Sequence, residues 1–134
     1  MINELSKIKR RILLIDDEED IRELLQMSLE MSSRWEVLTA GSGLEGLEMA
    51  RTYQPDAIIL DVIMPDMDGP MTFEQLQQDP ETRNIPVILL TAKAKADEQP
   101  RYTNLGVKAV LSKLINPLSF AEQLSNILEW PSGG

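Results

Sequence analysis

Acidic, hydroxyl and amino side chains follow short apolar runs in this 134-residue sequence. They stand at or just after the ends of four of the five runs: Asp16 and Asp17, Asp61, Thr91, and Lys113. Three carboxylates that lie close together raise one another's pKa unless a cation intervenes. Magnesium suits such a site because it prefers oxygen ligands and is commonly held by one or two carboxylates together with a phosphate. These residue types therefore predict a magnesium site that handles a phosphoryl group.

Asp61 is the candidate nucleophile of this site. Phosphoryl transfer requires mainly positioning and charge neutralisation, and an aspartate carboxylate can carry the phosphoryl group. Asp61 stands singly after its run, whereas Asp16 and Asp17 form a pair suited to orienting metal and water. Lys113 can pair with a carboxylate in the empty site and with a phosphoryl oxygen in the filled one. Thr91 can hydrogen-bond a second phosphoryl oxygen.

Each of these residues has a simpler explanation when it is taken alone. Residues 16–19 could merely cap a helix, Thr91 could belong to a turn, and Lys113 could form a surface ion pair. The functional interpretation depends on the side chains meeting at one place, and this is a question of fold.

The apolar runs predict five strands. The runs are short, and most are continuous rather than alternating, as in parallel strands that are covered on both faces. They occupy residues 12–15, 37–38, 57–60, 87–90 and 109–111.

The segments between the runs predict helices. Their start signals are the acidic stretch 16–20, the capping box of Ser42 and Glu45, the loop with Pro65 and Gly69, Asp97 before Pro100, and Asn116-Pro117. The segment with Pro100 should be the least regular, because proline is tolerated only in the first turn of a helix. Strand and helix alternate five times, which predicts an α/β fold with a doubly wound parallel sheet and helices on both faces. In such sheets the ligand site lies beyond the carboxyl ends of the strands.

Composition and charge restrict the function. Hydrophobic residues make up 43% and charged residues 26% of the sequence, as in one globular domain. The net charge of -9 disfavours binding to nucleic acid or to an anionic membrane. There are no cysteines, which excludes disulfides and thiolate metal sites. The first ten residues carry no apolar signal segment and no run is long enough to cross a bilayer, so a cytoplasmic location is expected.

The motifs resemble the receiver domain of two-component response regulators, especially the stand-alone chemotaxis type. The resemblance rests on Leu-Leu-Ile-Asp16-Asp17-Glu18, Asp61-Val-Ile-Met64-Pro65-Asp-Met-Asp68-Gly69, Thr91-Ala92, Gly106 and Lys113. It covers residues 11–130, which leaves 1–10 as an N-terminal extension and 131–134 as a C-terminal tail. It implies a flavodoxin-like, five-stranded sheet in the order 2-1-3-4-5.

The resemblance also implies roles for the site residues. Asp61 would be the phosphoacceptor, and Asp16, Asp17, Asp61 and the backbone carbonyl of Ile63 would surround Mg²⁺. Thr91 and Lys113 would carry the conformational response. The protein would then be no enzyme but a signalling phosphoacceptor that assists its own phosphotransfer and dephosphorylation.

The partners follow from the same resemblance. A histidine kinase or phosphotransfer protein would donate the phosphoryl group. No output domain follows the last predicted helix, so the signal is expected to pass to a separate output protein. The oligomeric state stays open, and a homodimer is one alternative.

Four positions bear on how such a receiver would work. Leu114 follows Lys113 where the family usually has a cis proline, and a cis bond without proline costs about 3–4 kcal/mol, so the loop is either trans or strained. Val110 stands where many relatives have an aromatic ring whose rotation accompanies activation. Ile63 and Lys93 flank the site where attacking water would enter, which predicts slow hydrolysis of the phosphorylated form.

Three alternative functions compete with this interpretation. An aspartyl-phosphate enzyme of the haloacid dehalogenase type usually has a second acid two residues after its nucleophile, and that position here is Ile63. An FMN-binding flavodoxin-like module must cradle a phosphate in its first loop, which residues 16–20 would repel. A degenerate receiver that acts only as a phosphorylation-independent docking module stays open because of Leu114.

Overall fold

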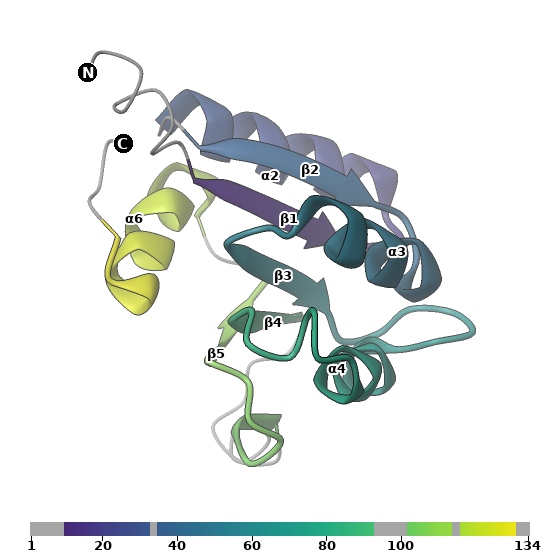
Figure 1. The fold of residues 1–134 in the computed structure, drawn as a ribbon. Coiled ribbons are helices and arrows are strands. Elements are labelled where there is room, and N and C mark those ends of the chain that lie inside the picture. The colour runs from purple at the N-terminus through teal and green to yellow at the C-terminus, as the bar shows by residue number, and fades with distance from the viewer. Residues whose placement is uncertain (1–9, 33–34, 93–101, 114–115, 131–134) are drawn as a thin grey trace.

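A five-stranded parallel sheet forms the centre of the molecule (Figure 1). The computed structural model describes residues 10–32, 35–92, 102–113 and 116–130. The sheet order is β2-β1-β3-β4-β5, and each neighbouring pair is parallel. The strands are β1 (Arg11–Ile15), β2 (Glu36–Ala40), β3 (Ala57–Asp61), β4 (Val87–Thr91) and β5 (Ala109–Ser112). The predicted fold class and strand order are confirmed.

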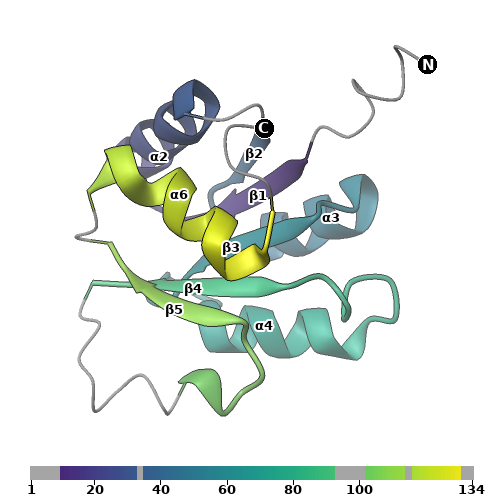
Figure 2. The same ribbon diagram turned by 90° about the vertical axis from the view of Figure 1, so that its left-hand side faces the viewer.

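Helices cover both faces of this sheet. They are α2 (Glu19–Ser32), α3 (Gly43–Tyr53), α4 (Gly69–Gln78) and α6 (Pro117–Leu128). Helices α2 and α6 pack on one face, and α3 and α4 pack on the other (Figures 1 and 2). The predicted helix around Pro100 lies largely outside the described residues. Within the described ranges, no helix has the length and apolar character needed to cross a membrane.

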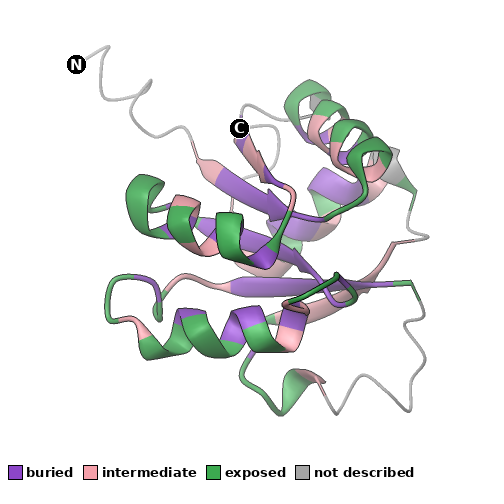
Figure 3. Ribbon diagram, turned by 90° about the vertical axis from the view of Figure 1, so that its right-hand side faces the viewer, coloured by how far each residue is buried: buried purple, intermediate pink, exposed green. Residues whose placement is uncertain are grey.

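Successive side chains of a strand enter different cores. In β1, Ile12 and Leu14 pack in the core beneath α2 and α6, whereas Leu13 and Ile15 pack in the core beneath α3 and α4. All four are fully buried. Figure 3 shows that the strands are largely buried and that the outer faces of the helices are exposed. The apolar runs are continuous because successive side chains point to opposite faces and both faces are covered.

Side-chain caps fix where α3 and α4 begin. Ser42 Oγ accepts the Glu45 N–H at 3.1 Å, and the Glu45 carboxylate accepts the Gly41 N–H at 2.6 Å. The predicted capping box thus forms, with its return bond one residue further upstream. The Asp68 carboxylate accepts the Met71 N–H at 2.9 Å and caps α4 in the same manner. These two caps set the first residues of α3 and α4.

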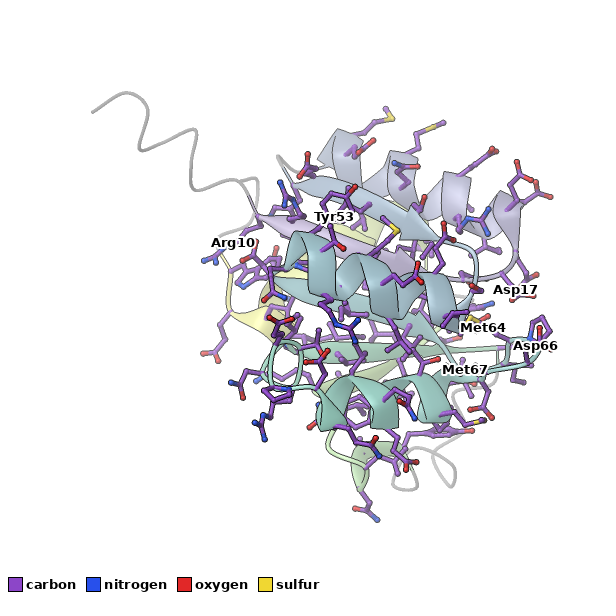
Figure 4. All side chains as sticks on the ribbon, turned by 45° about the vertical axis from the view of Figure 1, so that its right-hand side comes forward. Arg10, Asp17, Tyr53, Met64, Asp66 and Met67 are labelled. Carbon is purple, nitrogen blue, oxygen red and sulfur yellow. The ribbon has the colours of Figure 1, made fainter. Side chains whose placement is uncertain are left out.

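Two tryptophans pack at the end of the molecule opposite Asp17 and Asp66. The rings of Trp35 and Trp130 meet edge to face with centroids 5.4 Å apart, and the Arg10 guanidinium lies 5.0 Å from the Trp130 centroid. Figure 4 shows Arg10 at the opposite end of the molecule from Asp17 and Asp66. Trp35 is buried, and these rings therefore act as packing residues.

Candidate functional site

Two aspartates end adjacent strands at the centre of the sheet. Asp61 is the last residue of β3, and Asp16 directly follows β1, whose Ile15 pairs with Leu60. Parallel strands end at the same edge, and β1 lies at the switch point because it pairs with β2 on one side and with β3 on the other. Both side chains are buried, with Asp16 0% and Asp61 2% exposed. The sheet therefore gathers two charges that are far apart in the sequence.

Lys113 reaches this aspartate pair from the end of β5. Its Nζ lies 3.1 Å from Asp16 Oδ2 and 3.0 Å from Asp61 Oδ2. Its backbone N–H donates to the Thr91 carbonyl at 2.9 Å, which anchors the lysine beside β4. Its side chain is only 11% exposed, so water screens these ion pairs weakly.

The carboxylate of Glu18 completes the cluster. It accepts a hydrogen bond from Lys113 Nζ at 2.6 Å, and oxygens of Asp16, Glu18 and Asp61 all lie within 4.8 Å of one another. The sequence pattern selected Asp17 instead, which is exposed (Figure 4) and is not a member of this set. The available signal was the tendency of an aspartate side chain to bond the backbone two residues on, which links Asp16 to Glu18.

One oxygen of each buried aspartate lacks a hydrogen-bond donor among the described residues. These atoms are Asp16 Oδ2 and Asp61 Oδ2. The Lys113 ammonium lies within ion-pair distance of both and is shared between them. Asp16 Oδ1, in contrast, accepts the Glu18 N–H at 2.8 Å. One ammonium therefore serves two buried carboxylates, and a cation that prefers hard oxygen ligands, such as Mg²⁺, fits these two oxygens.

Burial raises the pKa of Asp61 to about 7, from an ordinary value of 3.8. The Lys113 ammonium opposes this rise, the Asp16 charge adds to it, and a backbone hydrogen bond from Ile63 lowers it again. Burial also lowers the pKa of Lys113, but the carboxylates of Glu18, Asp61 and Asp16 outweigh burial, so its pKa is raised. At neutral pH the lysine is therefore charged while Asp61 is near the midpoint of its titration.

The loop between β3 and α4 passes close over Asp61. The Gly69 N–H donates to the Val62 carbonyl at 2.8 Å. A Cβ on Gly69 would overlap the Asp61 carbonyl oxygen and lie 2.8 Å from Val62 Cα. The loop also contains Asp66, whose φ of 68° is left-handed, and Figure 4 shows this loop projecting at the same end as Asp17. Only glycine permits this close approach of the chain to the end of β3.

Three further residues of the predicted site lie within the described residues and differ in exposure. Thr91 ends β4 and is buried, at 5% exposure. Val110 lies in β5, half-buried against the core beneath α3 and α4. Ile63 follows β3, and its side chain is 73% exposed. Lys93 and Leu114 lie outside the described residues, so the predictions that concern them stay predictions.

Comparisons with known proteins agree on one family. The model of the response regulator receiver domain matches residues 12–125. The polar-differentiation response regulator DivK of Brucella ovis is 33% identical over 119 residues, which cover 89% of this chain and 96% of DivK. The alkaline phosphatase synthesis transcriptional regulatory protein PhoP of Bacillus subtilis is 36% identical over 121 residues, or 90% of this chain. The chain spans only 49% of the length of PhoP.

A solved structure shows the same fold. The chemotaxis protein CheY4 of Vibrio cholerae superposes with a TM-score of 0.81 at 27% sequence identity. The match covers 89% of this chain and 98% of CheY4.

Gly69→Ala should lower the free energy of unfolding by about 1–3 kcal/mol, because the added methyl group meets backbone at the end of β3. Urea denaturation followed by tryptophan fluorescence measures this loss. Gly41→Ala is the matched control, since its Cβ would meet the flexible end of Arg22, with Nη1 at 3.2 Å. Equal losses in both variants would contradict the close approach at Gly69.

Asp61→Asn should raise the free energy of unfolding at pH 8 by about 1–3 kcal/mol in a chelating buffer, and by less at pH 5. The reason is that Asp61 ionises near pH 3.8 when unfolded but near pH 7 when folded, so stability falls as pH rises between these values. The asparagine variant has no charge to bury. Urea denaturation at the two pH values measures the difference.

Asp79→Asn is the control of opposite sign. The Glu81 backbone N–H, followed by the Arg51 guanidinium, lowers the pKa of Asp79. Its charge is therefore favourable in the folded state above the ordinary pKa, and its removal should bring no gain at either pH. A gain in this control as large as that of Asp61→Asn would show that burial of Asp61 is not the cause.

Proposed function

The chain belongs to the response regulator receiver domain family, and on this basis we propose that it is a signalling switch whose phosphoacceptor is Asp61. The observation that carries the proposal is the Asp61 carboxylate, buried at the end of β3 with its Oδ2 3.0 Å from Lys113 Nζ. A carboxylate oxygen at this position can attack phosphorus, and the adjacent ammonium favours the incoming negative charge. The protein acts as a phosphoacceptor rather than as an enzyme with a separate substrate.

The proposed ligands of Mg²⁺ are the carboxylates of Asp16, Asp17 and Asp61 and the backbone carbonyl of Ile63. The burial of Asp16 and Asp61 at one edge of the sheet supports both as members of this set. Asp17 is exposed beside Asp16, and magnesium commonly retains water among its ligands. The bound ion would neutralise negative charge on the carboxylates and on the transferring phosphoryl group.

The transfer step requires Asp61 and Lys113 to change partners. An Asp61 carboxylate oxygen forms a bond to phosphorus while the bond from phosphorus to the donor nitrogen breaks, and the electron pair leaves with that nitrogen. The Lys113 ammonium then moves from the carboxylate to a phosphoryl oxygen. The Thr91 hydroxyl donates to another phosphoryl oxygen. This exchange is the proposed conformational response, and half-buried Val110 beside it would adjust without an aromatic ring.

The donor is proposed to be a histidine kinase or a phosphotransfer protein. This chain contains no histidine, so a phosphohistidine donor has to come from another protein. A separate output protein would read the phosphorylated state. The net charge of -9 supports protein partners over nucleic acid or anionic membrane.

The domain bounds and the cellular location are also proposals. Residues 11–130 would form the receiver domain, with 1–10 as an extension and 131–134 as a tail. The family match over residues 12–125 supports the proposed bounds of the receiver domain. A cytoplasmic location is the expectation from the sequence, and cell fractionation with an antibody to this protein would test it.

A degenerate receiver that docks without phosphorylation is the second candidate function. The observation that favours it is Leu114, which replaces the usual proline after Lys113. If this change prevents Lys113 from following the phosphoryl group, partner binding would be independent of phosphorylation.

Acetyl phosphate with Mg²⁺ should add one phosphoryl group to the wild-type protein, and Asp61→Asn should abolish the addition. Intact-protein mass spectrometry measures the change. Asp66→Asn, at an exposed carboxylate of the adjacent loop, is the matched control and should accept the group normally. An unmodified wild-type protein would support the docking module, and a modified Asp61→Asn would refute the assignment of Asp61.

The phosphorylated form should hydrolyse slowly, and Ile63→Asn should shorten its lifetime several-fold. The physical reason is that an apolar side chain next to Asp61 hinders ordering of the attacking water, whereas an amide can hydrogen-bond it. Decay of the phosphorylated mass after removal of acetyl phosphate measures the lifetime. Leu44→Asn, at another exposed apolar residue at the start of α3, serves as control. A wild-type half-life of seconds, or no change in Ile63→Asn, would contradict the proposed role.

A further inference from the structure

Arg22 contacts the loop that follows β1, and the phosphotransfer proposed above assigns it no role. Its Nη1 atom donates a hydrogen bond to the backbone carbonyl of Asp16 at 2.7 Å. We propose that Arg22 is a positioning residue, whose guanidinium fixes the peptide between Asp16 and Asp17 so that both carboxylates are presented to one cation. The inference rests on the proposed function in taking Asp16 and Asp17 as members of the magnesium site.

The Asp16 carbonyl needs a donor because it lies where the sheet ends. Asp16 is fully buried, and a buried carbonyl without a donor costs free energy. The Asp16 N–H still belongs to the ladder, since it donates to the Ala40 carbonyl at 3.1 Å. Strand β2 ends at Ala40, and the Gly41 N–H turns to the Glu45 carboxylate at 2.6 Å. The side chain of Arg22 therefore supplies a donor at the point where β2 leaves β1.

The guanidinium of Arg22 lies between two segments of the chain. The backbone of Arg22 belongs to the start of α2, where its N–H donates to the Glu18 carbonyl at 3.0 Å. The side chain reaches from there to the residue that follows β2, because a Cβ on Gly41 would lie 3.2 Å from Nη1 and 3.6 Å from Cζ. Arg22 is half-buried, so its contacts are partly shielded from water. A hydrogen bond from such a charged donor is about twice as strong as a neutral one.

The hydrogen bond to the Asp16 carbonyl controls the direction of Asp17. The peptide group is planar, so a carbonyl held in one direction also sets the direction of the Asp17 N–H and Cα. Asp16 itself is held further, because its Oδ1 accepts the Glu18 N–H at 2.8 Å and its Oδ2 lies 3.1 Å from Lys113 Nζ. Asp17 is exposed, so packing restricts its side chain little. Arg22 therefore fixes the peptide that joins a buried carboxylate to an exposed one.

The charge of Arg22 and its hydrogen bond have opposite effects on a cation. A guanidinium beside the loop repels a divalent cation, so removal of the charge alone would tighten magnesium binding. Loss of the hydrogen bond would weaken binding, because groups that orient metal ligands commonly contribute about 10–100-fold to metal affinity. A contribution to folding alone would leave the magnesium affinity of the folded protein unchanged. The three explanations therefore predict three different results.

Magnesium titration by isothermal calorimetry of the wild type, Arg22→Met and Arg22→Lys tests the inference. Arg22→Met keeps an apolar stem in the helix but removes the charge and the donor, and it should weaken magnesium binding about tenfold. Arg22→Lys keeps the charge and an N–H donor without the planar fork of arginine, and it should recover part of the loss. Arg22→Ala replaces Arg22→Met if the latter does not fold.

Arg51→Met is the matched control for the titration. It removes the same charge and also breaks a tertiary contact, since Arg51 Nε lies 2.9 Å from Asp79 Oδ2. Arg51 belongs to the last turn of α3, which returns the chain from the carboxyl end of β2 to the start of β3. It therefore lies at the opposite end of the strands from the acidic residues, and its loss should change the magnesium affinity little.

A second measurement tests the hydrogen bond without magnesium. The Asp17 amide belongs to the peptide that Arg22 holds. In the nitrogen–proton correlation spectrum of the metal-free protein, this amide should shift in Arg22→Met by more than the amides of α6. An Asp17 amide that does not shift would overturn the proposal. So would an unchanged or tighter magnesium affinity in Arg22→Met, or an equal loss in Arg22→Lys.

The two measurements separate this inference from the proposed function. A wild-type protein that binds no magnesium would refute the cation site, and with it the purpose assigned to Arg22. A wild-type protein that binds magnesium as tightly as Arg22→Met does would refute the role of Arg22 alone.

Discussion

The Lys113 ammonium lies between the buried carboxylates of Asp16 and Asp61, and the behaviour of the site depends on this arrangement. Buried charges are costly unless they are paired and hydrogen-bonded. Here the pairing is incomplete, because one oxygen of each aspartate has no donor among the described residues. The fold thus maintains an unfavourable concentration of negative charge that a divalent cation or a protonation can relieve.

The parallel sheet supplies the means to maintain this concentration. Asp61 ends β3, Asp16 and Lys113 directly follow β1 and β5, and all strands of a parallel sheet end at one edge. The cores on both faces, one beneath α2 and α6 and one beneath α3 and α4, hold those strand ends in place. Their apolar burial offsets the electrostatic cost at the edge, as is common where a functional site stores strain.

The same burial links stability to reactivity. Burial raises the pKa of Asp61 to about 7, and the energy that disfavours its charge also favours any partner that neutralises it. A carboxylate whose charge is disfavoured by burial responds readily to a ligand that neutralises it, and this suits a receiver domain. The acidic first loop and the apolar residue at position 63 are compatible with this chemistry. They do not suit a flavin phosphate site or a dehalogenase-type acid pair.

The sequence alone determined the fold and most of the site. Continuous apolar runs predicted a covered parallel sheet, and the rule that such sheets bind ligands at their carboxyl ends brought Asp16, Asp61 and Lys113 to one edge. Local signals sufficed because runs and caps depend on neighbours in the chain, as the Ser42 and Glu45 capping box illustrates.

Tertiary structure decided the orientation of the side chains at the site and the distances between segments that are remote in the sequence. Only the folded chain shows that Asp17 is exposed while Glu18 contacts Lys113, a residue 95 positions away. Only the approach of the loop to the end of β3 explains why Gly69 has to lack a side chain. The order of residues specifies which groups arrive at the edge of the sheet, but which way a side chain points there is set by packing between segments that are remote in the sequence.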